Sequence, residues 1–596
     1  MTGFANYFIY LFFLAFLSSC SSFALGRRLP KPEGPVKISF LLTNDLHGHL
    51  APDLTYLATI TRQLRARPEY RNDTAALLVL DAGDQFQGTL LSNYNEGRSM
   101  FKVMNRIGYD AVIPGNHDYD FGPLGWLFDQ VTPGKTSNHP REVIEDLART
   151  ADFPLLSANT YLKDSILAGG KTLPLDSECK PLNATPAAPL DFAAARSPGF
   201  LTPYRIFTRA GVRIAVIGLD NHATASTTTK ENVDDLCFRD EVETYLEIRR
   251  SLEGKADVFV ALMHNGDTDQ STDATVIARK INAAIPDGVD LVAAGHTHAL
   301  HDHIEGGVHI LQDGANARAY GRIDLFYDPE SRKVLKEKTL SAAGIPLKSD
   351  ACPVNAAGFA CSQLSLPLAS DPGADRIIES AIREVEPLAK KKLGVASDKI
   401  WVSRTDESPL ANQLTDALRI AANTDVALLN TGGIRAPLLK GEILYENLFE
   451  TLPFQNQAVV IQSMPWPALK SALLAAAKTC GRYGALMQSG LKIRFRRNCK
   501  NAVDQLDATA ALVSVHTLDG TVLLDPEKGT EAPANTTFTV ATLDFLASGG
   551  SGYTMLGGSS VSKKLGIFRE IVAETWSQFH PEITAERDGR FRNLNQ

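Results

Sequence analysis

Five short apolar runs, each ending in polar residues, most constrain what this chain can fold into. They are VKISFLLTND (36–45), ALLVLDAGD (76–84), DAVIPGNHD (110–118), DVFVALMHN (257–265) and DLVAAGHTH (290–298). Their length and their content of Val, Ile and Leu are typical of buried strands. Ligands of open α/β sheets bind beyond the carboxyl ends of the strands, so we expect these polar residues to converge there.

The polar residues that end these runs are of the types that bind divalent metal ions. They are Asp45, His47, Asp84, Asn116, His264, His296 and His298. Carboxylates can bridge two cations, and neutral imidazoles suit Zn, Mn, Fe or Co. Two cations about 3.5–4 Å apart can clamp a phosphoryl group and lower the pKa of bound water from about 15.7 towards 7. The sequence therefore predicts a dinuclear site bridged by Asp84, with hydroxide as the nucleophile.

The motifs around these residues resemble those of the dinuclear metallophosphoesterases, and more closely those of the 5′-nucleotidase/UDP-sugar hydrolase branch. They are DLHGH (45–49), DAGDQFQG (81–88), GNHDYD (115–120), HNGD (264–267) and GHTH (295–298). The resemblance implies a four-layer αββα sandwich. It implies that one metal is held by Asp45, His47, Asp84 and His298, and the other by Asp84, Asn116, His264 and His296.

The same resemblance assigns a catalytic dyad to His117 and Asp120. In that family the imidazole stabilises the phosphoryl oxygens or assists the leaving group, and the carboxylate orients it and favours its protonated form. One residue departs from the pattern, because Asp118 stands where the family more often has Glu.

A simpler explanation exists for each motif taken alone. A single Asp-x-His or Gly-His-Thr-His sequence after a strand is more often a helix cap or a turn than a metal site. Five such motifs in the family order, each at the end of a strand, favour the metal site. His49 is a candidate only for a supporting position behind the ligands.

The second half of the chain carries a separate signal in NTGGIR (430–435), LPFQNQ (452–457) and DFLASGGSGY (544–553). Paired glycines let the backbone approach an anion, and Arg435 offers a two-pronged donor to phosphate. Two aromatic rings can sandwich a nucleobase, each stack contributing about 1–3 kcal/mol. By resemblance to the family's C-terminal domain, Phe454 and Phe545 stack the base, Asn456 and Gly490 touch its edge, and Arg404 and Arg435 hold phosphate.

Two departures affect this second site. Ser551 stands where the family normally offers an Asp to the ribose hydroxyls, and Ile400 stands where some relatives have a further phosphate-binding Arg. A single Phe beside Gly is more often a packing residue than a base platform. The base sandwich is therefore predicted from the three motifs together.

The chain has 596 residues, which is too long for one core and suggests two or three domains. We expect a metallophosphoesterase domain at 36–350, a linker helix at 371–395 and a separate α+β substrate-binding domain at 396–585. If base and metals bind to different domains, hinge motion must bring them together. The net charge of −8 gives no attraction to a nucleic acid polymer.

The N-terminus predicts export to the periplasm or the cell surface. FIYLFFLAFLSS (8–19) has the length of a signal-peptide core, although no Lys or Arg precedes it. Residues 1–26 are interpreted as a signal peptide or a lipoprotein signal. LSSC (17–20) resembles a bacterial lipobox, in which Cys20 would carry a lipid anchor; the alternative is ordinary cleavage near Ala24.

Six cysteines remain beyond Cys20, an even number that permits three disulfides in an oxidising compartment. Nearness in sequence favours Cys352–Cys361 and Cys480–Cys499, which leaves Cys179 and Cys237 to pair. No pair has the CxxC spacing typical of a metal site.

These observations predict an exported, metal-dependent phosphohydrolase that cleaves nucleoside 5′-monophosphates by attack of metal-bound hydroxide, with UDP-sugars as further substrates. Alternatives are a 2′,3′-cyclic nucleotide phosphodiesterase/3′-nucleotidase, a thiosulfohydrolase, or a catalytically silent surface binding protein. The two phenylalanines argue against the thiosulfohydrolase, and the complete ligand set argues against the silent protein. The sequence does not decide the metal (Zn, Mn, Co, Fe or Mg), the base or the oligomeric state.

Overall fold

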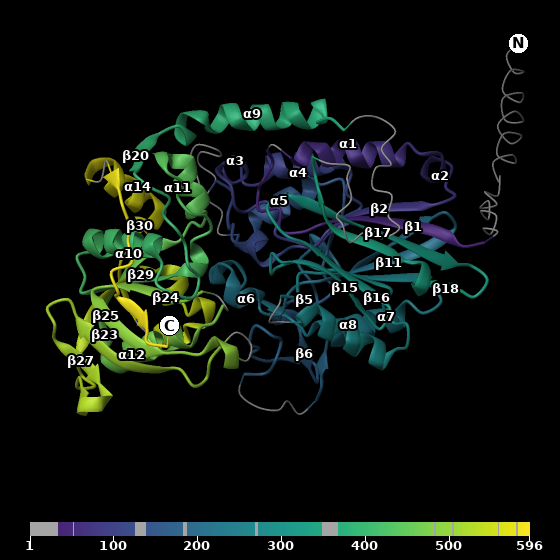
Figure 1. Ribbon diagram of the computed structural model, residues 1–596. Coiled ribbons are helices and arrows are strands. Elements are labelled where there is room, and N and C mark those ends of the chain that lie inside the picture. The colour runs from purple at the N-terminus through teal and green to yellow at the C-terminus, as the bar shows by residue number, and fades with distance from the viewer. Residues whose placement is uncertain are drawn as a thin grey trace, which may run out of the picture.

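The computed structural model describes residues 34–51, 53–125, 139–182, 188–268, 272–348, 368–481, 484–502, 506–557, 560–579 and 582–595. The chain forms two domains, and the long helix α9 (Pro372–Ala389) runs across both of them (Figure 1). Residues 1–26, with Cys20, and the pair Cys352 and Cys361 lie outside the described residues.

The first domain contains two large sheets. One has the order β18-β17-β1-β2-β3-β4-β9, with β19 also pairing with β17. Its strands are β1 (Val36–Thr43), β2 (Ala76–Asp81), β3 (Ala111–Val112), β4 (Leu155–Leu156), β9 (Leu201–Thr202), β17 (Ala319–Asp328), β18 (Lys333–Val334) and β19 (Leu340–Pro346). The run from β1 to β9 is parallel, so the carboxyl ends of these strands meet at one edge.

The other sheet has the order β10-β11-β13-β14-β16-β15. Its strands are β10 (Tyr204–Arg209), β11 (Val212–Leu219), β13 (Val258–Met263), β14 (Leu291–Ala293), β15 (Leu300–Glu305) and β16 (Val308–Asp313). β11, β13, β14 and β16 are parallel to one another. Four of the five predicted apolar runs contain strands of three to eight residues, β1, β2, β13 and β14, and the run 110–118 contains only the two-residue strand β3.

The two sheets pack face to face, and helices cover their outer faces. Phe40, Leu78, Val216 and Val260 belong to the buried cluster between the sheets. Outside the first sheet lie α1 (Leu54–Arg65), α4 (Arg98–Ile107) and α5 (Glu142–Thr150), and outside the second lie α7 (Glu241–Ser251) and α8 (Asp273–Ala284). The predicted four-layer αββα sandwich is confirmed.

Shorter elements complete the first domain. They are α2 (Pro68–Arg71), α3 (Leu90–Asn93), α6 (Thr224–Thr227), β5 (Thr160–Leu162), β6 (Leu167–Ala168), β7 (Lys171–Thr172), β8 (Leu190–Asp191) and β12 (Leu236–Phe238). A disulfide between Cys179 and Cys237 joins β12 to the segment between β7 and β8, as the sequence predicted. Leu90 of α3 is part of the buried cluster of the second domain, so the two domains share a packed boundary.

Helix α9 is anchored to the first domain at its N-terminus. Asp371 caps the helix by accepting hydrogen bonds from Gly373 N and Ala374 N, and it also pairs with Arg62 and Arg106. The predicted helix 371–395 is therefore present but ends earlier, at Ala389. Residues 392–395, which the sequence predicted as the end of this helix, instead belong to strand β20 (Lys392–Ala396). This strand pairs with two strands of the second domain.

The second domain contains three sheets around one core. Their orders are β22-β20-β31, β24-β21-β29-β23-β30 and β28-β27-β26-β25-β32. The strands are β21 (Val426–Asn430), β22 (Gly441–Leu444), β23 (Gln457–Pro465), β24 (Leu486–Ser489), β25 (Leu491–Arg496), β26 (Ala511–Thr517), β27 (Val522–Asp525), β28 (Thr530–Glu531), β29 (Thr537–Leu543), β30 (Val561–Ile567), β31 (Glu582–Ile583) and β32 (Phe591–Asn593). The helices are α10 (Pro409–Ala422), α11 (Tyr445–Thr451), α12 (Trp466–Lys478), α13 (Asp544–Ala547) and α14 (Phe568–Phe579). The predicted α+β character of this domain is confirmed.

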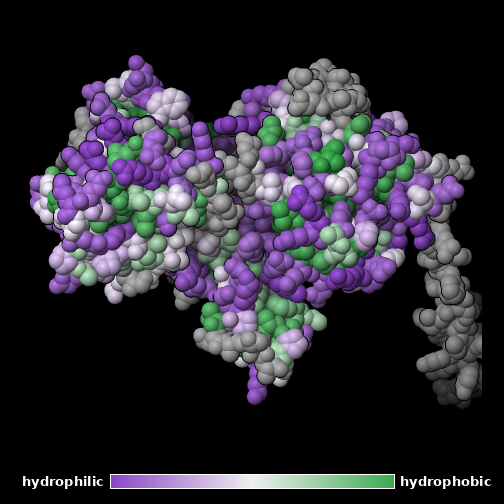
Figure 2. All heavy atoms as spheres, turned by 60° about the horizontal axis from the view of Figure 1, so that its bottom comes forward, coloured by the Kyte–Doolittle hydropathy of each residue, from purple (hydrophilic) through white to green (hydrophobic). Residues whose placement is uncertain are grey.

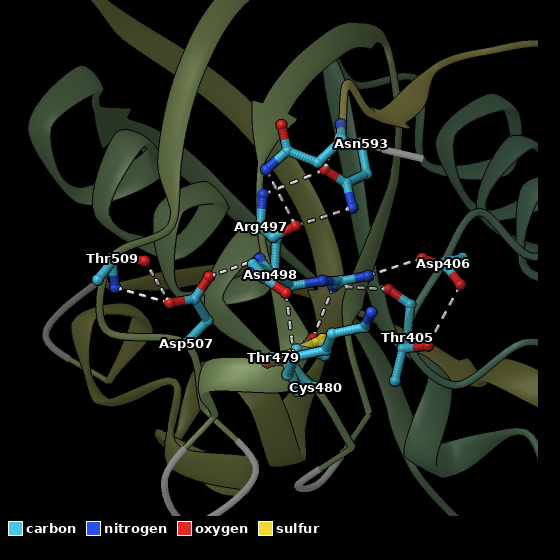
Figure 3. The surroundings of a disulfide bond; sticks show 12 residues. Thr405, Asp406, Thr479, Cys480, Arg497, Asn498, Asp507, Thr509 and Asn593 are labelled. Atoms are coloured by element: carbon cyan, nitrogen blue, oxygen red, sulfur yellow. Dashed lines mark hydrogen bonds and ion pairs between the residues drawn. A yellow bond between two sulfur atoms is a disulfide. The ribbon is translucent and has the colours of Figure 1, made fainter.

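The predicted disulfide between Cys480 and Cys499 is confirmed and lies beside a buried arginine (Figure 3). Arg497 is 3% exposed, and its guanidinium donates to the carbonyls of Thr405 and Thr479 at 3.0 and 2.6 Å and to Asp406 Oδ1 at 2.6 Å. This network joins the end of α12 to the loop that carries Arg404.

The surface of both domains carries both hydrophilic and hydrophobic side chains. Figure 2 shows hydrophilic side chains over most of the visible face, with hydrophobic ones in small separate patches. Within the described ranges, no helix is both long enough and apolar enough to span a bilayer.

Candidate metal centre and substrate cleft

All seven predicted metal ligands lie in loops that follow parallel strands of the two facing sheets. Asp45 and His47 follow β1, Asp84 follows β2, Asn116 follows β3, His264 follows β13, and His296 and His298 follow β14. Because the two sheets lie face to face, the loops of both reach one point. The structure therefore brings together every ligand that the sequence predicted.

The backbone at this point is unusual, since five of the ligands have the left-handed conformation. These residues and their φ angles are Asp45 (+50°), His47 (+47°), Asp84 (+57°), His296 (+79°) and His298 (+58°). Non-glycine residues rarely adopt this conformation, and where they do it is often at functional sites. The less favourable backbone conformation of these five residues turns their side chains towards the centre.

Four of the side chains form one compact group. Ligand atoms of Asp45, His47, Asp84 and His298 all lie within 4.8 Å of one another. His47 Nε2 is 2.9 Å from His298 Nε2 and 3.6 Å from Asp84 Oδ2. His298 Nε2 is 3.5 Å from Asp45 Oδ1. This set of nitrogen and carboxylate donors fits one divalent cation.

A second group shares Asp84 with the first. His264 Nε2 lies 3.3 Å from Asp84 Oδ2 and 3.2 Å from Asn116 Oδ1, and His296 Nδ1 lies 2.9 Å from the same Asn116 oxygen. These donors fit a second divalent cation beside the first. The centre therefore has the composition of a dinuclear site with Asp84 between its two halves.

Backbone carbonyls fix the orientation of two imidazoles. His47 Nδ1 is 2.9 Å from Gln87 O, and His264 Nδ1 is 2.7 Å from Ala82 O. A ring nitrogen that donates to a carbonyl leaves the other nitrogen free to bind a metal, which is a common arrangement around metal-binding histidines. In both residues that free nitrogen is Nε2, the atom that points to the centre.

The electrostatics of the centre also fit bound cations. Burial opposes ionisation of Asp84, but the facing His264 and His117 hold the pKa of its carboxyl well below the usual range. Burial likewise opposes protonation of His264, but Asp84 and Asp45 raise its pKa to about 10. Burial raises the pKa of Asp45 to about 7 and lowers that of His296 to about 3. The buried centre thus stabilises a positive charge beside Asp84 and favours the neutral forms of Asp45 and His296.

The two loops around Asp84 are packed very closely. A side chain at Gly115 would come within 2.1 Å of Asp84 Oδ1, so only glycine allows this approach. Asp118 holds both loops by accepting from the backbone N–H groups of Asp84, Gln85 and Gly115 at 2.8–3.0 Å. The Asp found in place of the usual Glu therefore has a clear structural role in this chain.

The predicted dyad lies at the edge of this centre. His117 Nδ1 is 2.7 Å from Asp120 Oδ2, and the two side chains are 15% and 13% exposed. Asp120 Oδ1 accepts from Thr228 Oγ1 at 2.9 Å and from Thr229 N at 3.2 Å. These contacts fix the carboxylate and leave the Nε2 side of the imidazole to face a substrate.

Residues of the second domain meet the metal centre directly. Arg435 Nη2 donates to His298 Nε2 at 3.4 Å, and the Phe454 ring centroid is 5.1 Å from that of His117. Burial and the neighbouring Arg404 lower the pKa of Arg435 to about 10, so it still carries charge at neutral pH. In this structure the two domains are therefore closed on each other.

One cavity of about 840 Å³ is lined by four of the metal ligands, Asp84, Asn116, His296 and His298, and by most of the predicted substrate residues. The residues of the second domain that line it are Arg404, Asn430, Gly432, Gly433, Arg435, Pro453, Phe454, Gln455, Asn456, Gly481, Phe545 and Ser551. The cavity thus places two phenylalanines and two arginines beside the metal ligands.

The loop of Arg404 is held by its backbone. The Arg404 carbonyl accepts from Ala485 N at 2.7 Å and from Thr431 Oγ1 at 2.8 Å, and Arg497 holds the next residue, Thr405. The disulfide region in Figure 3 therefore supports a residue of the cleft.

The prediction for Gly490 is not supported by its position. Gly490 lies between β24 and β25 with φ +101°, outside the residues that line the cavity, and a side chain there would meet the Asp425 carbonyl at 2.1 Å. The turn between β24 and β25 therefore accounts for a glycine at this position.

Sequence reasoning missed two amide side chains of the cleft. Gln455 lies between Phe454 and Asn456 and lines the cavity, and neither its Oε1 nor its Nε2 has a hydrogen-bond partner among the described residues. Asn430 donates to Ser551 Oγ at 3.2 Å, while its Oδ1 has no partner within the same part of the chain. Gln455 belongs to the motif LPFQNQ and Asn430 to NTGGIR. Their positions in these motifs could have identified them from the sequence.

Comparisons with known proteins agree with this geometry. Residues 38–300 match the family model of the calcineurin-like phosphoesterases, and residues 390–558 match that of the 5′-nucleotidase C-terminal domain. The chain is 26% identical to a trifunctional nucleotide phosphoesterase of Bacillus subtilis over 95% of its own length, but it spans only 35% of that relative. It is 26% identical to the protein UshA of Yersinia enterocolitica, covering 87% of this chain and 86% of UshA.

A solved structure shows the same fold. The 5′-nucleotidase precursor of Thermus thermophilus superimposes with a TM-score of 0.68 at 22% identity, over 94% of this chain and 100% of that one. The likeness covers both domains.

Proposed function

Since the chain belongs to the 5′-nucleotidase family of metallophosphoesterases and is a phosphate-ester hydrolase, we propose that it hydrolyses nucleoside 5′-monophosphates to nucleoside and phosphate. One observation carries the proposal: Arg435 and Phe454 of the second domain lie against His298 and His117 of the metal centre, in one cavity. A phosphate at the metal ligands would leave its nucleoside beside Phe454. Relatives whose names include nucleotide phosphoesterase and 5′-nucleotidase support this choice.

The proposed reaction uses the side chains of the centre as follows. Two divalent cations held by the seven ligands would supply positive charge for the phosphate and lower the pKa of water to near neutrality. Arg435 offers a two-pronged donor to the phosphoryl oxygens. His117, oriented through Nδ1 by Asp120, holds a proton at Nε2 for the departing nucleoside oxygen.

The nucleoside is held by the second domain in this proposal. Phe454 and Phe545 stack the base, and Asn456 and Gln455 offer polar groups to its edge. Asn430 Oδ1, which has no partner among the described residues, accepts from a ribose hydroxyl. Asn430 would then take part of the role of the family Asp, because Ser551 is occupied as its hydrogen-bond partner.

UDP-sugars are a second candidate, because the cavity continues past the metal ligands into the first domain. We also propose that the protein is exported, with residues 1–26 as its signal and Cys20 as a lipid anchor. The two disulfides agree with an oxidising compartment.

A substrate comparison tests the proposed function. We expect kcat/KM for AMP and UMP to exceed that for p-nitrophenyl phosphate and for 2′,3′-cyclic AMP. Faster cleavage of the cyclic nucleotide would identify the phosphodiesterase instead. Absence of turnover on every compound, with metal bound, would identify a silent binding protein.

A further inference from the structure

A buried arginine of helix α14 lies behind the loop that carries Phe454. Arg569 is the second residue of α14, which lies beside α11 (Figure 1), and the residue is only 1% exposed. It does not belong to the residues that line the substrate cavity. Any effect of this arginine on the substrate must therefore pass through the residues that it contacts.

The loop 452–456 connects α11 to β23 and contains neither helix nor strand. Phe454, Gln455 and Asn456 belong to this loop and line the substrate cavity. A segment outside helices and strands has no ladder of hydrogen bonds of its own, so its backbone groups need partners from other elements. The conformation of this loop therefore depends on the groups that bind its carbonyls.

Arg569 binds two of these carbonyls. Its Nη1 donates to Leu452 O at 2.9 Å and to Phe454 O at 3.3 Å. The preceding residue of the helix, Phe568, donates its backbone N–H to Asn456 O at 2.9 Å. The start of α14 thus holds the loop at its beginning, at Phe454 and at its end.

The guanidinium of Arg569 is itself held in one orientation. Its carbon Cζ lies 3.9 Å from the centroid of the Phe449 ring. Its Nε donates to Tyr445 Oη at 3.2 Å and to Glu570 Oε1 at 3.3 Å. A planar guanidinium that is stacked on a ring and bonded at one edge presents its other edge in a fixed direction. In Arg569 that other edge faces the carbonyls of the loop.

Anchoring of the helix does not by itself explain an arginine at this position. Helix α14 is already held in the core of the second domain by Phe568, Val572, Ala573 and Trp576. Taking a charged group out of water costs more free energy than burying an apolar side chain of similar volume. A buried arginine that binds the substrate loop therefore indicates a role in placing that loop.

The cleft residue most directly affected by these contacts is Phe454. Its ring centroid is 5.1 Å from that of His117, and Arg435 Cζ lies 5.8 Å from the centroid of the same ring. A shift of the Phe454 backbone would move the ring relative to both side chains. Displacements of about 1 Å in a substrate site can change a rate by about a hundredfold.

We propose that Arg569 is a positioning residue that places the Phe454 ring for the nucleobase by holding the carbonyls of Leu452 and Phe454. This inference rests on the proposed function, because it requires the base to stack on Phe454. Arg569 acts through the loop and does not touch the substrate. Its loss therefore affects substrates that carry a nucleobase and spares those that do not.

Replacing Arg569 by Met tests the proposal, because Met keeps an apolar contact with Phe449 and has no donor for the carbonyls. In Arg569→Met, kcat/KM for AMP should fall at least about fivefold, and that for p-nitrophenyl phosphate should stay within about twofold of the wild type. Arg569→Lys keeps one charged donor and should recover part of the loss on AMP. Glu570→Gln is the matched control, since Glu570 bonds to Arg569 and Tyr445, and it should change neither value.

A double variant separates positioning from a general loss of structure. Arg569→Met/Phe454→Ala should have the same kcat/KM for AMP as Phe454→Ala alone, within about twofold, because Arg569 acts through that ring. Circular dichroism establishes that each variant is folded. If Arg569→Met does not fold, Arg569→Lys carries the comparison, and a fall on AMP without a fall on p-nitrophenyl phosphate is the expected result.

Three results would overturn the inference while leaving the proposed function standing. They are equal losses on AMP and p-nitrophenyl phosphate in the folded Arg569 variant, no loss on AMP in that variant, and losses that multiply in the double variant. If the wild type releases no phosphate from AMP, the proposed function fails and this inference fails with it.

Discussion

Replacing Asp120 by Asn tests the role of the dyad without changing its shape. In the wild type Asp120 Oδ2 is 2.7 Å from His117 Nδ1, and Oδ1 is held by Thr228 and Thr229. Asn can keep the Oδ1 contacts, but its amide would donate to Nδ1 and stabilise the neutral ring with its proton on Nε2. The variant should fold normally and lose the stabilisation of the protonated imidazole.

The expected size of the effect follows from this one bond. A hydrogen bond to a charged group contributes about 1.5–3 kcal/mol, and each 1.36 kcal/mol changes a rate tenfold. The pair is mostly shielded from solvent, with exposures of 15% and 13%, so little of this is lost to screening. We expect kcat for AMP to fall roughly 10- to 150-fold in Asp120→Asn, with KM and metal content unchanged.

Steady-state phosphate release and metal analysis of the purified variant provide the assay. The double variant His117→Asn/Asp120→Asn should be no slower than His117→Asn alone, since Asp120 acts through the imidazole. A kcat within twofold of the wild type, or additive losses in the double variant, would refute this role.

Four further substitutions test other parts of the structure. Phe454→Ala and Phe545→Ala should each lower kcat/KM for AMP about 5- to 150-fold, from 1–3 kcal/mol per stack, and leave p-nitrophenyl phosphate within about twofold; equal losses on both substrates would exclude base stacking. Arg497→Met should lower the free energy of unfolding by about 3 kcal/mol and raise KM for AMP by loosening the Arg404 loop, and unchanged urea denaturation would contradict this. Asp290 is buried, which raises its pKa from 3.8 to about 7, so stability falls as the pH rises between these values. Asp290→Asn should therefore gain up to about 4 kcal/mol over the wild type at pH 8 and nothing below pH 4, whereas an equal gain at both pH values would show another cause.

The metal centre could be predicted from the sequence because each ligand is a local feature. His264 follows directly after β13, and Asp45 stands two residues after β1, so a run of apolar residues already marks where each ligand lies. The parallel arrangement of the strands then determines that these ends meet. No knowledge of long-range contacts beyond the sheet topology was needed.

Other features depend on contacts between distant segments, which the sequence does not reveal. The linker helix ends at Ala389 because β20 pairs with strands about 50 and 190 residues away. Gly490 was assigned to the base edge by resemblance but lies in a turn against the Asp425 carbonyl. The amide of Gln455 and the Oδ1 of Asn430, which have no hydrogen-bond partner among the described residues, can be recognised only when every neighbouring donor and acceptor is placed.

The most direct test of the central claim is phosphate release from AMP and UMP by the purified protein in Mn²⁺, compared with its Asp84→Asn variant. Asp84 lies between both ligand groups, 3.6 Å from His47 and 3.3 Å from His264, so its loss should impair both metal positions together. We predict rapid release by the wild type, about two metal ions per chain and a fall of at least about a hundredfold in the variant. Release that is independent of metal and of Asp84 would contradict the account.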